Sequence, residues 1–279
     1  CGPMPTVMND AIELYYETFG IQDDPVVVCL PGMGNQLLIY PEAFCMALVD
    51  RGFYVIRMDN RDAGLSSITA DDDEYTLSDM ADDVVAVLDD VGVGTAVVLG
   101  LSLGGMIAQQ LAVDHPDRVR ALVSLASTTG ELDLPAASDE VVAALTAPSK
   151  ATVEEQIEAD IAARKLWANP EWFDVDQLRA FFTELHQRAF VPGGGMRQLE
   201  AALRGPDRID GLRALNVPAL VVHGEHDTLL PIEHGRRTAE LIPGAEFLEI
   251  EGMSHDFVYQ VWPPLVEAMT VLTARTFDG

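Results

Sequence analysis

The sequence predicts an α/β fold: a mostly parallel, doubly wound sheet with a helical cap inserted after the sixth strand. Strand-length apolar runs alternate with helix-length segments over residues 11–125 and again over 219–276, the pattern of helices packed on both faces of a parallel sheet. Residues 130–212 contain no convincing strand, only helical stretches separated by prolines. A chain of 279 residues is long enough to bury one large core beside such an accessory region.

The first part of the chain supplies most of the predicted sheet. Residues 11–19 alternate apolar and polar side chains, so we expect an edge strand there. The continuous apolar run at 26–30 predicts a buried parallel strand. Further strands are predicted at 53–58, 95–101 and 119–125. Helical spacing between them, with Thr76 or Ser78 as a candidate N-cap, predicts helices at 41–51, 76–91 and 103–115.

The second part of the chain divides into the predicted cap and the end of the sheet. We expect a core domain of residues 1–129 and 213–279 and a cap domain of residues 130–212. The predicted cap helices lie near 139–146, 153–167, 175–190 and 196–203. After the cap, the predicted order is strand 219–223, helix 232–242, strand 245–250 and helix 261–276.

The net charge of the chain and the length of its apolar runs argue against nucleic acids and membranes as partners. The chain has 45 acidic and 17 basic residues, a net charge of −28, and such a surface repels nucleic acids and anionic lipid headgroups. No apolar run approaches the roughly 18 residues of a membrane span. We therefore expect a small-molecule substrate, no nucleic acid and no membrane span. The oligomeric state stays open, a homodimer being one option.

The cysteines and the N-terminus bear on the compartment. Cys1, Cys29 and Cys45 form an odd, widely spaced set without zinc-ligand spacing, so we expect neither disulfides nor a metal site. No signal peptide is visible. Cys1 is either the lipid-bearing first residue of a lipoprotein or a cloning remnant ahead of Met4. We favour the remnant and expect a cytoplasmic protein.

A pentapeptide between a strand and a helix supplies the candidate nucleophile. Gly100-Leu101-Ser102-Leu103-Gly104 matches G-x-S-x-G, in which the serine lies on a sharp, strained turn with its hydroxyl exposed above the sheet. Glycines are needed on either side because strand and helix approach closely there. Placed between this strand and this helix, the motif predicts Ser102 as a catalytic nucleophile.

A serine hydroxyl needs a base, and the loops after the last two strands offer one together with a carboxylate. His255 follows strand 245–250 and Asp227 follows strand 219–223, and ligands bind at this carboxyl edge of a parallel sheet. We predict His255 as the base and Asp227 as the group that orients it. Glu225 is the rival carboxylate. His223 and His226 lack a third matched ligand, so a metal site there is disfavoured.

The loop after strand 26–30 is the candidate second half of an oxyanion hole. It reads Pro31-Gly32-Met33-Gly34-Asn35, and its glycines let a backbone amide turn inward. We predict the Met33 and Leu103 N–H groups as the two donors. No Gly-Lys-Ser/Thr follows, so this is not a phosphate-binding loop.

The chain resembles the α/β-hydrolase superfamily over nearly its whole length outside the cap. In detail it resembles a branch of bacterial esterases that includes the aclacinomycin methylesterases. The likeness rests on the Asn60-Arg61-Asp62-x-Gly64-x-Ser66 turn, on Gly195-Met196-Arg197-Gln198-Leu199, and on 218–223 leading into Asp227. It implies ester hydrolysis through an acyl-enzyme without metal or organic cofactor. The chain departs from many relatives in carrying Pro31-Gly32 where they carry His-Gly, and proline removes one backbone donor.

The leading hypothesis is a carboxylesterase acting on small to medium, largely uncharged esters. Two rival functions are a carbon–carbon bond hydrolase and a cofactor-free perhydrolase, since both kinds of enzyme have a similar triad and fold. A hydrolase-like binding protein without turnover is a third alternative. Serine at position 102 argues against haloalkane dehalogenases and epoxide hydrolases, which resemble this fold but use aspartate there. The predicted cap is rich in large apolar side chains, a few of which we expect to line the pocket. They are Leu166, Trp167, Trp172, Phe173, Phe181, Phe182 and Phe190.

Overall fold

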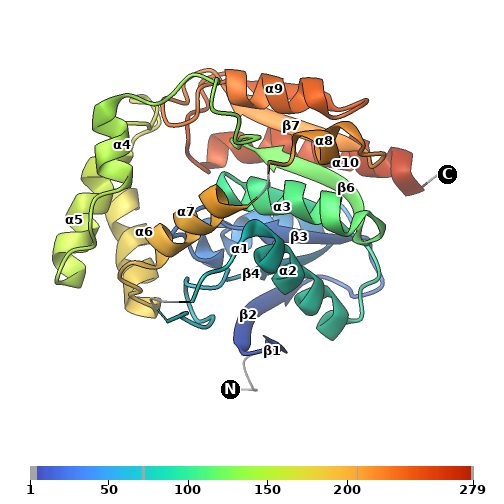
Figure 1. Ribbon diagram of the computed structural model, residues 1–279, viewed down its shortest axis with the longest axis horizontal. Helices are drawn as coiled ribbons and strands as arrows, with labels where there is room; N and C mark the ends of the chain where they lie inside the picture. The colour runs from blue at the N-terminus through green and yellow to red at the C-terminus, as the bar shows by residue number, and fades with distance from the viewer. Residues whose placement is uncertain (1–4, 71–72, 206, 278–279) are drawn as a thin grey trace.

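One eight-stranded sheet forms the centre of the molecule (Figure 1). This computed structural model describes residues 5–70, 73–205 and 207–277, so the expectations for Cys1 lie outside the described residues. The strand order is β1-β2-β4-β3-β5-β6-β7-β8, and every neighbouring pair from β4 onward is parallel. The strands are β1 Thr6–Asn9, β2 Ile12–Phe19, β3 Val26–Leu30, β4 Tyr54–Met58, β5 Ala96–Leu101, β6 Val119–Leu125, β7 Ala219–Gly224 and β8 Glu246–Ile250.

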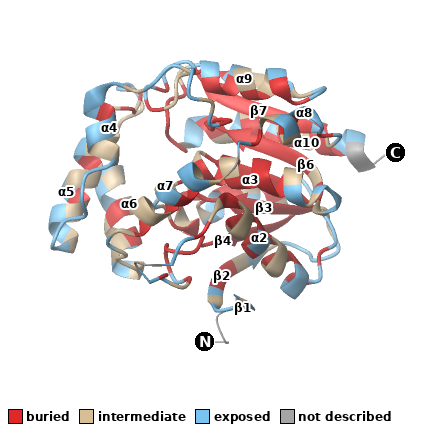
Figure 2. Ribbon diagram, viewed as in Figure 1, coloured by how far each residue is buried: buried red, intermediate tan, exposed pale blue. Residues whose placement is uncertain are grey.

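Helices cover both faces of this sheet, as a doubly wound fold requires. Alternate side chains of β3 and β5 enter two separate hydrophobic clusters, because successive residues of a strand point to opposite faces. One cluster packs against α2 Leu77–Val91 and α3 Leu103–Asp114, and the other against α1 Glu42–Val49 and α10 Trp262–Phe277. The central strands are consequently buried along their whole length (Figure 2). The predicted fold class is confirmed.

The edge of the sheet differs from the expectation. We predicted residues 11–19 as an edge strand, but β2 is paired on both sides, with β4 and with the unpredicted β1. The two strands form an antiparallel hairpin whose turn places Asp10 at a φ of 51°. The four residues of β1 were too few to show a periodic pattern. The signal that could have found this hairpin is Asn9-Asp10, since both residue types tolerate a left-handed turn.

The segment between β6 and β7 contains no strand among its described residues. Its helices are α4 Asp139–Leu145, α5 Val153–Arg164, α6 Val175–Arg188, α7 Gly194–Arg204 and α8 Ile209–Arg213. Helices α4, α5 and α6 lie to one side of the sheet in Figure 1, and α5 and α6 share a small hydrophobic cluster built on Ile157, Ile161 and Phe182. Because β1 adds one strand, β6 is the sixth, and the helical insertion follows it as predicted.

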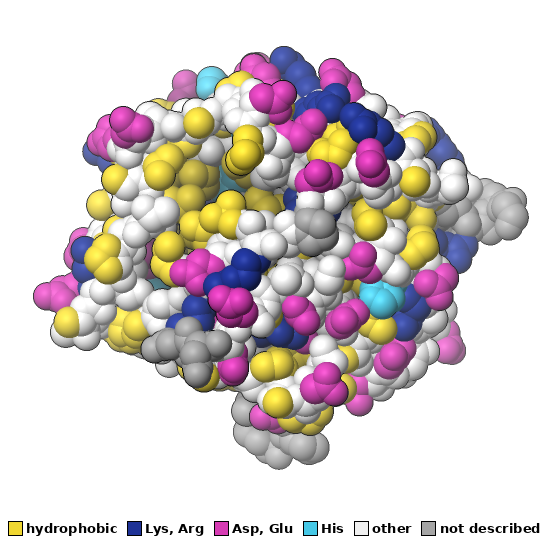
Figure 3. All heavy atoms as spheres, in the orientation of Figure 1, with side chains coloured by type: hydrophobic (Ala, Val, Ile, Leu, Met, Phe, Trp, Pro, Cys, Tyr) yellow, Lys and Arg dark blue, Asp and Glu magenta, His cyan; other side chains and the backbone are white. Residues whose placement is uncertain are grey.

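Surface and interior also bear on the expectations from composition. In the described part of the chain no helix has both the length and the apolar character needed to cross a membrane. Figure 3 shows acidic side chains scattered over the face in view.

Cys29 and Cys45 are buried and free, and burial raises the pKa of the Cys45 thiol to about 12. Both are core residues, as predicted.

The start of helix α2 tests whether the predicted N-cap stabilises the helix. Thr76 is its N-cap: the Thr76 hydroxyl accepts from the Asp79 backbone N–H, and the Asp79 carboxylate accepts from the Thr76 backbone N–H. We expect Thr76→Ala to lower the free energy of unfolding by about 1 kcal/mol, since the Asp79 N–H loses its acceptor and the Asp79 carboxylate loses the Thr76 hydroxyl as a donor. Urea denaturation measures it. Thr95→Ala, at an exposed position before β5, is the control, and an equal loss in both variants would contradict the capping account.

Candidate active site

Ser102 lies at the tip of a strained turn between β5 and α3. Its backbone has φ 54° and ψ −116°, a left-handed conformation that costs a non-glycine residue of order 1–3 kcal/mol. The turn is held from both sides, because the Ser102 N–H donates to the Leu125 carbonyl at 2.8 Å and its own carbonyl accepts from the Ser127 hydroxyl at 2.7 Å. This geometry lifts the Ser102 side chain away from the sheet.

The glycines around Ser102 allow the strand and the helix to meet. A Cβ on Gly100 would overlap the Gly104 carbonyl, and a Cβ on Gly104 would overlap the Leu30 carbonyl at the end of β3. A Cβ on Gly105 would lie 2.5 Å from that of Ser127. Each obstacle is either backbone or the start of a side chain, so it cannot rotate away. The close approach expected from the pentapeptide is confirmed.

His255 and Asp227 come together at the carboxyl edge of the sheet. The Nδ1 of His255 donates to Asp227 Oδ2 at 2.7 Å, and both residues are buried. Burial alone would raise the pKa of the Asp227 carboxyl, but the neighbouring His255 and His223 rings outweigh it and lower that pKa. An ionised carboxylate only accepts hydrogen bonds, so Nδ1 carries the proton and Nε2 of a neutral ring is free to accept one.

The loop that carries Asp227 is fixed by its own backbone and by His223. The backbone N–H groups of Leu229 and Leu230 donate to Asp227 Oδ1 at 2.9 and 2.8 Å. His223, fully buried in β7, donates from Nε2 to the Leu230 carbonyl at 2.7 Å and lies 3.3 Å from Asp227 Oδ2. His223 therefore acts on the orientation of Asp227, a role that the sequence did not suggest.

Ser102 and His255 face one cavity of about 230 Å³, which also touches the loop after β3 and helices α5, α6 and α7. In Figure 3 a hollow with largely hydrophobic walls opens on the face in view. Within the described residues no direct hydrogen bond joins the Ser102 hydroxyl to the His255 ring. Contacts of this kind often tighten only when substrate binds.

The predicted oxyanion donors lie on the same cavity or beside it. Met33 lines the cavity wall together with Gly32 and Gly34. Leu103 is the first residue of α3, and a first-turn N–H has no acceptor within its own helix. The Pro31 carbonyl accepts from the Asn60 side chain at 3.1 Å, and the Gly34 N–H donates to Gln198 of α7 at 2.8 Å. This last contact was not predicted.

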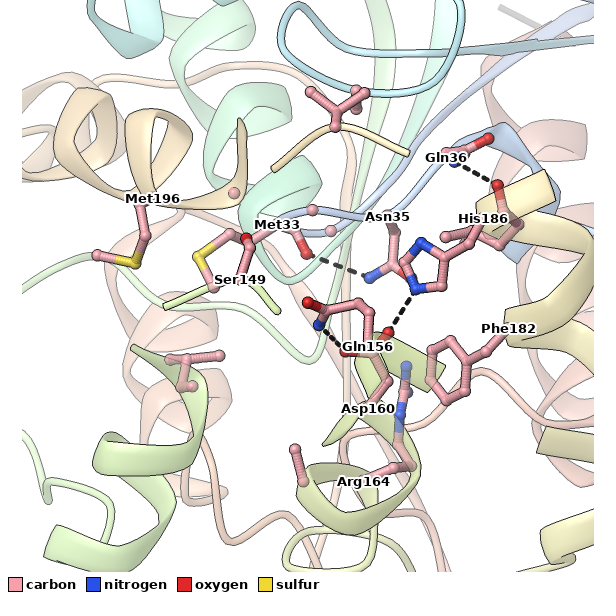
Figure 4. A pocket seen from close by; sticks show the side chains of 18 of the residues that line it. Met33, Asn35, Gln36, Ser149, Gln156, Asp160, Arg164, Phe182, His186 and Met196 are labelled. Carbon is pink, nitrogen blue, oxygen red and sulfur yellow. Dashed lines mark hydrogen bonds and ion pairs between the residues drawn. The ribbon is translucent and has the colours of Figure 1, made fainter. Parts of the chain in front are cut away.

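The cap supplies a wall with both polar and aromatic parts (Figure 4). His186 of α6 contacts Asp160 of α5 at 2.6 Å through Nε2, and Gln156 donates to the same carboxylate at 2.8 Å. Beside them, Arg164 pairs with Asp256. Of the seven apolar cap residues singled out from the sequence, three line the cavity. They are Trp167, Phe182 and Phe190.

The remaining candidates lie apart from this cavity. Glu225 is exposed and pairs with His226 at 3.7 Å, and among the described residues no hydrogen bond or ion pair joins it to His255. Among the other histidines, His115 at the end of α3 pairs with Asp82 of α2 at 2.7 Å. Over the described ranges no group of three or more His, Cys, Asp or Glu side chains could hold a metal ion, and the buried His223 and exposed His226 do not converge.

Comparison with known proteins decides the family. The model of the family described as the alpha/beta hydrolase fold matches residues 25–177, more than half of the chain. The chain belongs to this family. Rhodomycin D methylesterase DnrP of Streptomyces peucetius is 30% identical over 97% of this chain and 98% of its own. A pimeloyl-[acyl-carrier protein] methyl ester esterase of Aeromonas hydrophila is 29% identical over 86% of this chain and 91% of its own. The predicted class, an ester-cleaving hydrolase of this fold, is confirmed.

Solved structures agree with the fold assignment. The esterase RhEst1 from Rhodococcus sp. ECU1013 superposes with a TM-score of 0.79 over 96% of this chain and 98% of its own, at 24% identity. Est816, described as an N-acyl homoserine lactone degrading enzyme, superposes with a TM-score of 0.72 over 97% of this chain and 99% of its own, at 28% identity.

The close packing around the Ser102 turn can be tested with a pair of glycine variants. We expect Gly104→Ala to destabilise the protein by about 1–3 kcal/mol or more, because its methyl group meets the Leu30 backbone and the strand and helix must separate. Hydrolysis of a p-nitrophenyl ester should fall with it as Ser102 shifts. Gly94→Ala is the matched control, since nothing lies within 4 Å of a Cβ there. Thermal melting compares the two, and equal melting temperatures would refute the close-approach account.

Proposed function

We propose that this protein is a serine carboxylesterase in which Ser102 attacks the ester, His255 carries the proton and Asp227 orients His255. The observation that carries the proposal is the strained turn of Ser102 on the same cavity wall as a histidine held by a buried carboxylate. The order nucleophile, acid, base along the chain is that of α/β-hydrolases.

The first half of the reaction forms an acyl-enzyme. His255 Nε2 accepts the Ser102 hydroxyl proton while Oγ attacks the ester carbonyl, and a tetrahedral oxyanion develops between the Met33 and Leu103 N–H groups. Asp227 stabilises the imidazolium that results, and its low pKa keeps it ionised. His255 then returns the proton to the departing alkoxide. The alcohol leaves, and Ser102 Oγ holds the acyl group.

Water completes the cycle by the same route in reverse. His255 takes a proton from a water molecule, whose oxygen attacks the acyl carbonyl. The second tetrahedral intermediate collapses, Ser102 Oγ leaves and recovers the proton from His255, and the carboxylic acid is released. The protein needs no other group for these steps than the two donors and the histidine–aspartate pair.

For the substrate we propose a small to medium, largely uncharged ester, with a methyl ester as the first choice. Two of the relatives above are named as methyl ester esterases. A cavity of about 230 Å³ is at the small end for ligand sites, and a net charge of −28 disfavours anionic esters. We further propose that residues 130–212 act as a cap domain over residues 1–129 and 213–279.

Covalent trapping tests the nucleophile. We expect a fluorophosphonate to add once per molecule, at Ser102, in the wild-type protein, because only an activated serine displaces its fluoride at a useful rate. Peptide mass spectrometry locates the adduct. Ser102→Ala should take up no label while retaining the wild-type melting temperature within a few degrees, and an adduct on another residue of the folded wild-type protein would defeat the assignment.

The carboxylate is tested by an isosteric change. Asp227→Asn keeps the shape but allows the wrong histidine tautomer, and we expect kcat to fall by about 10⁴. Glu225→Gln is the control, because Glu225 is exposed and pairs with the neighbouring His226; its kcat should stay within about twofold. Steady-state hydrolysis of p-nitrophenyl acetate and butyrate gives both numbers. A large loss in Glu225→Gln with full activity in Asp227→Asn would reverse the two roles.

A substrate panel separates this function from its alternatives. We expect turnover of p-nitrophenyl and methyl esters to exceed that of a vinylogous diketone and of acetate with hydrogen peroxide by at least about tenfold in kcat/KM. Faster carbon–carbon cleavage, or faster peroxyacid formation, would identify one of the rival chemistries. Specific binding of an ester without turnover would support the non-catalytic reading.

A further inference from the structure

The loop after β3, residues 31–36, is held by the cap as well as by the core. Gln198 of α7 is fully buried, and its side chain accepts from the Gly34 N–H at 2.8 Å while donating to the Arg61 carbonyl at 2.8 Å. Gln36, at the other end of the loop, donates to the Leu185 and Ala189 carbonyls of α6, each at 2.8 Å (Figure 4). Both ends of the loop are therefore tied to cap helices.

The glycine run before α7 explains how Gln198 comes so close. A Cβ on Gly194 would overlap the Asp62 carbonyl, and a Cβ on Gly195 would lie 3.4 Å from Gly34 Cα. Gly194 thus lets the start of α7 rest on the backbone at Asp62, and Gly195 lies beside Gly34 of the loop. A third contact holds the helix in place, since Arg197 pairs with the buried Asp62 carboxylate at 2.9 Å.

The position of this contact matters because Met33 immediately precedes Gly34. Gly34 itself is exposed, with a left-handed φ of 67°, but its N–H shares a peptide plane with the Met33 carbonyl, so the Gln198 contact fixes the plane that follows Met33. The plane that precedes Met33 carries the Met33 N–H and the Gly32 carbonyl, and that carbonyl accepts from the Asn35 N–H at 3.1 Å, which closes the turn. If Gln198 is removed, we expect the Gly34 amide to rotate toward water and the Met33 amide to shift with the turn.

We propose that Gln198 is a positioning residue that orients the Met33 N–H toward the oxyanion, so that the docked cap completes the oxyanion hole. This rests on the proposed function, in which Met33 is one of the two donors. The cap then contributes to the chemical step as well as to the pocket. Any movement that lifts α7 from the loop breaks the Gly34 contact and disables the hole, and closure restores it.

The test compares Gln198→Met with wild type. Methionine has a similar length but neither hydrogen-bonding group, so we expect kcat to fall about 10- to 100-fold with KM within about twofold, since the oxyanion forms only in the transition state. The affinity of a trifluoromethyl ketone, which forms a tetrahedral oxyanion on the serine, should fall by the same factor as kcat/KM. Gln110→Met is the control: Gln110 is also buried but bonds Asp114 at the far end of α3, and its kcat should be unchanged.

Two further variants keep the test decisive if Gln198→Met folds poorly. Gln198→Glu retains an acceptor for the Gly34 N–H, and its kcat should lie between those of wild type and Gln198→Met. Gly194→Ala leaves every hydrogen-bonding group in place but puts a methyl group onto the Asp62 carbonyl, so that the start of α7 must lift, and we expect a kcat loss of about tenfold with KM unchanged.

The outcomes separate this inference from the function beneath it. Fluorophosphonate labelling of Ser102 in wild type and in Gln198→Met, to the same final stoichiometry, establishes the nucleophile in both. With labelling intact, a kcat/KM and a ketone affinity within threefold of wild type in both Gln198→Met and Gly194→Ala would overturn the role of Gln198 alone. Failure of wild type to label at Ser102 would overturn the proposed function, and this inference with it.

Discussion

The close approach of β3, β5 and α3 is the constraint on which the site depends. Gly100, Gly104 and Gly105 let three backbones pass within contact of one another, and Ser102 is held in a left-handed conformation by hydrogen bonds to Leu125 and Ser127. The strain at Ser102 persists only because this packing over-determines it. The same packing brings the first amide of α3 beside the serine, so that the proposed nucleophile and one proposed oxyanion donor come from one turn.

The negative charge of Asp227, behind His255, depends on the hydrogen-bond partners that surround this buried carboxylate. Asp227 has three groups in hydrogen-bond contact, two backbone N–H groups and the His255 ring, and a second histidine at 3.3 Å. A buried carboxylate without such partners would be protonated at neutral pH. With them it stays ionised and fixes the tautomer of His255. Stability and orientation thus arise from the same contacts, and His223 joins β7 to the loop that provides them.

The sequence was enough to predict the core strands and the local geometry of the Ser102 turn, because both follow from residue patterns within a few positions of the chain. Buried parallel strands show as short, mostly apolar runs, and G-x-S-x-G between a strand and a helix is compatible with few other structures. The chain order of Ser102, Asp227 and His255 then needed only the rule that loops meet at the carboxyl edge. The hairpin of β1 was missed because four residues carry no period. The Gln198 and His186 contacts were missed for a different reason, since they join segments that are more than 20 residues apart and a single sequence contains no record of which pairs touch.

These missed contacts share a feature that separates the cap from the core. In the core, backbone ladders and apolar faces decide the arrangement, and patterns along the chain report both. The helical segment between β6 and β7 meets the core through apolar contacts, such as those of Val141 and Trp167 with Leu229, and also through polar side chains. These are Gln198 on the loop of residues 31–36, Arg197 on Asp62, and Gln36 reaching into α6. Apolar contacts stabilise in proportion to the area buried and depend little on direction, whereas each polar contact requires a defined distance and angle. The polar contacts therefore fix where α6 and α7 lie against the loop of residues 31–36, and with it the shape of the cavity wall.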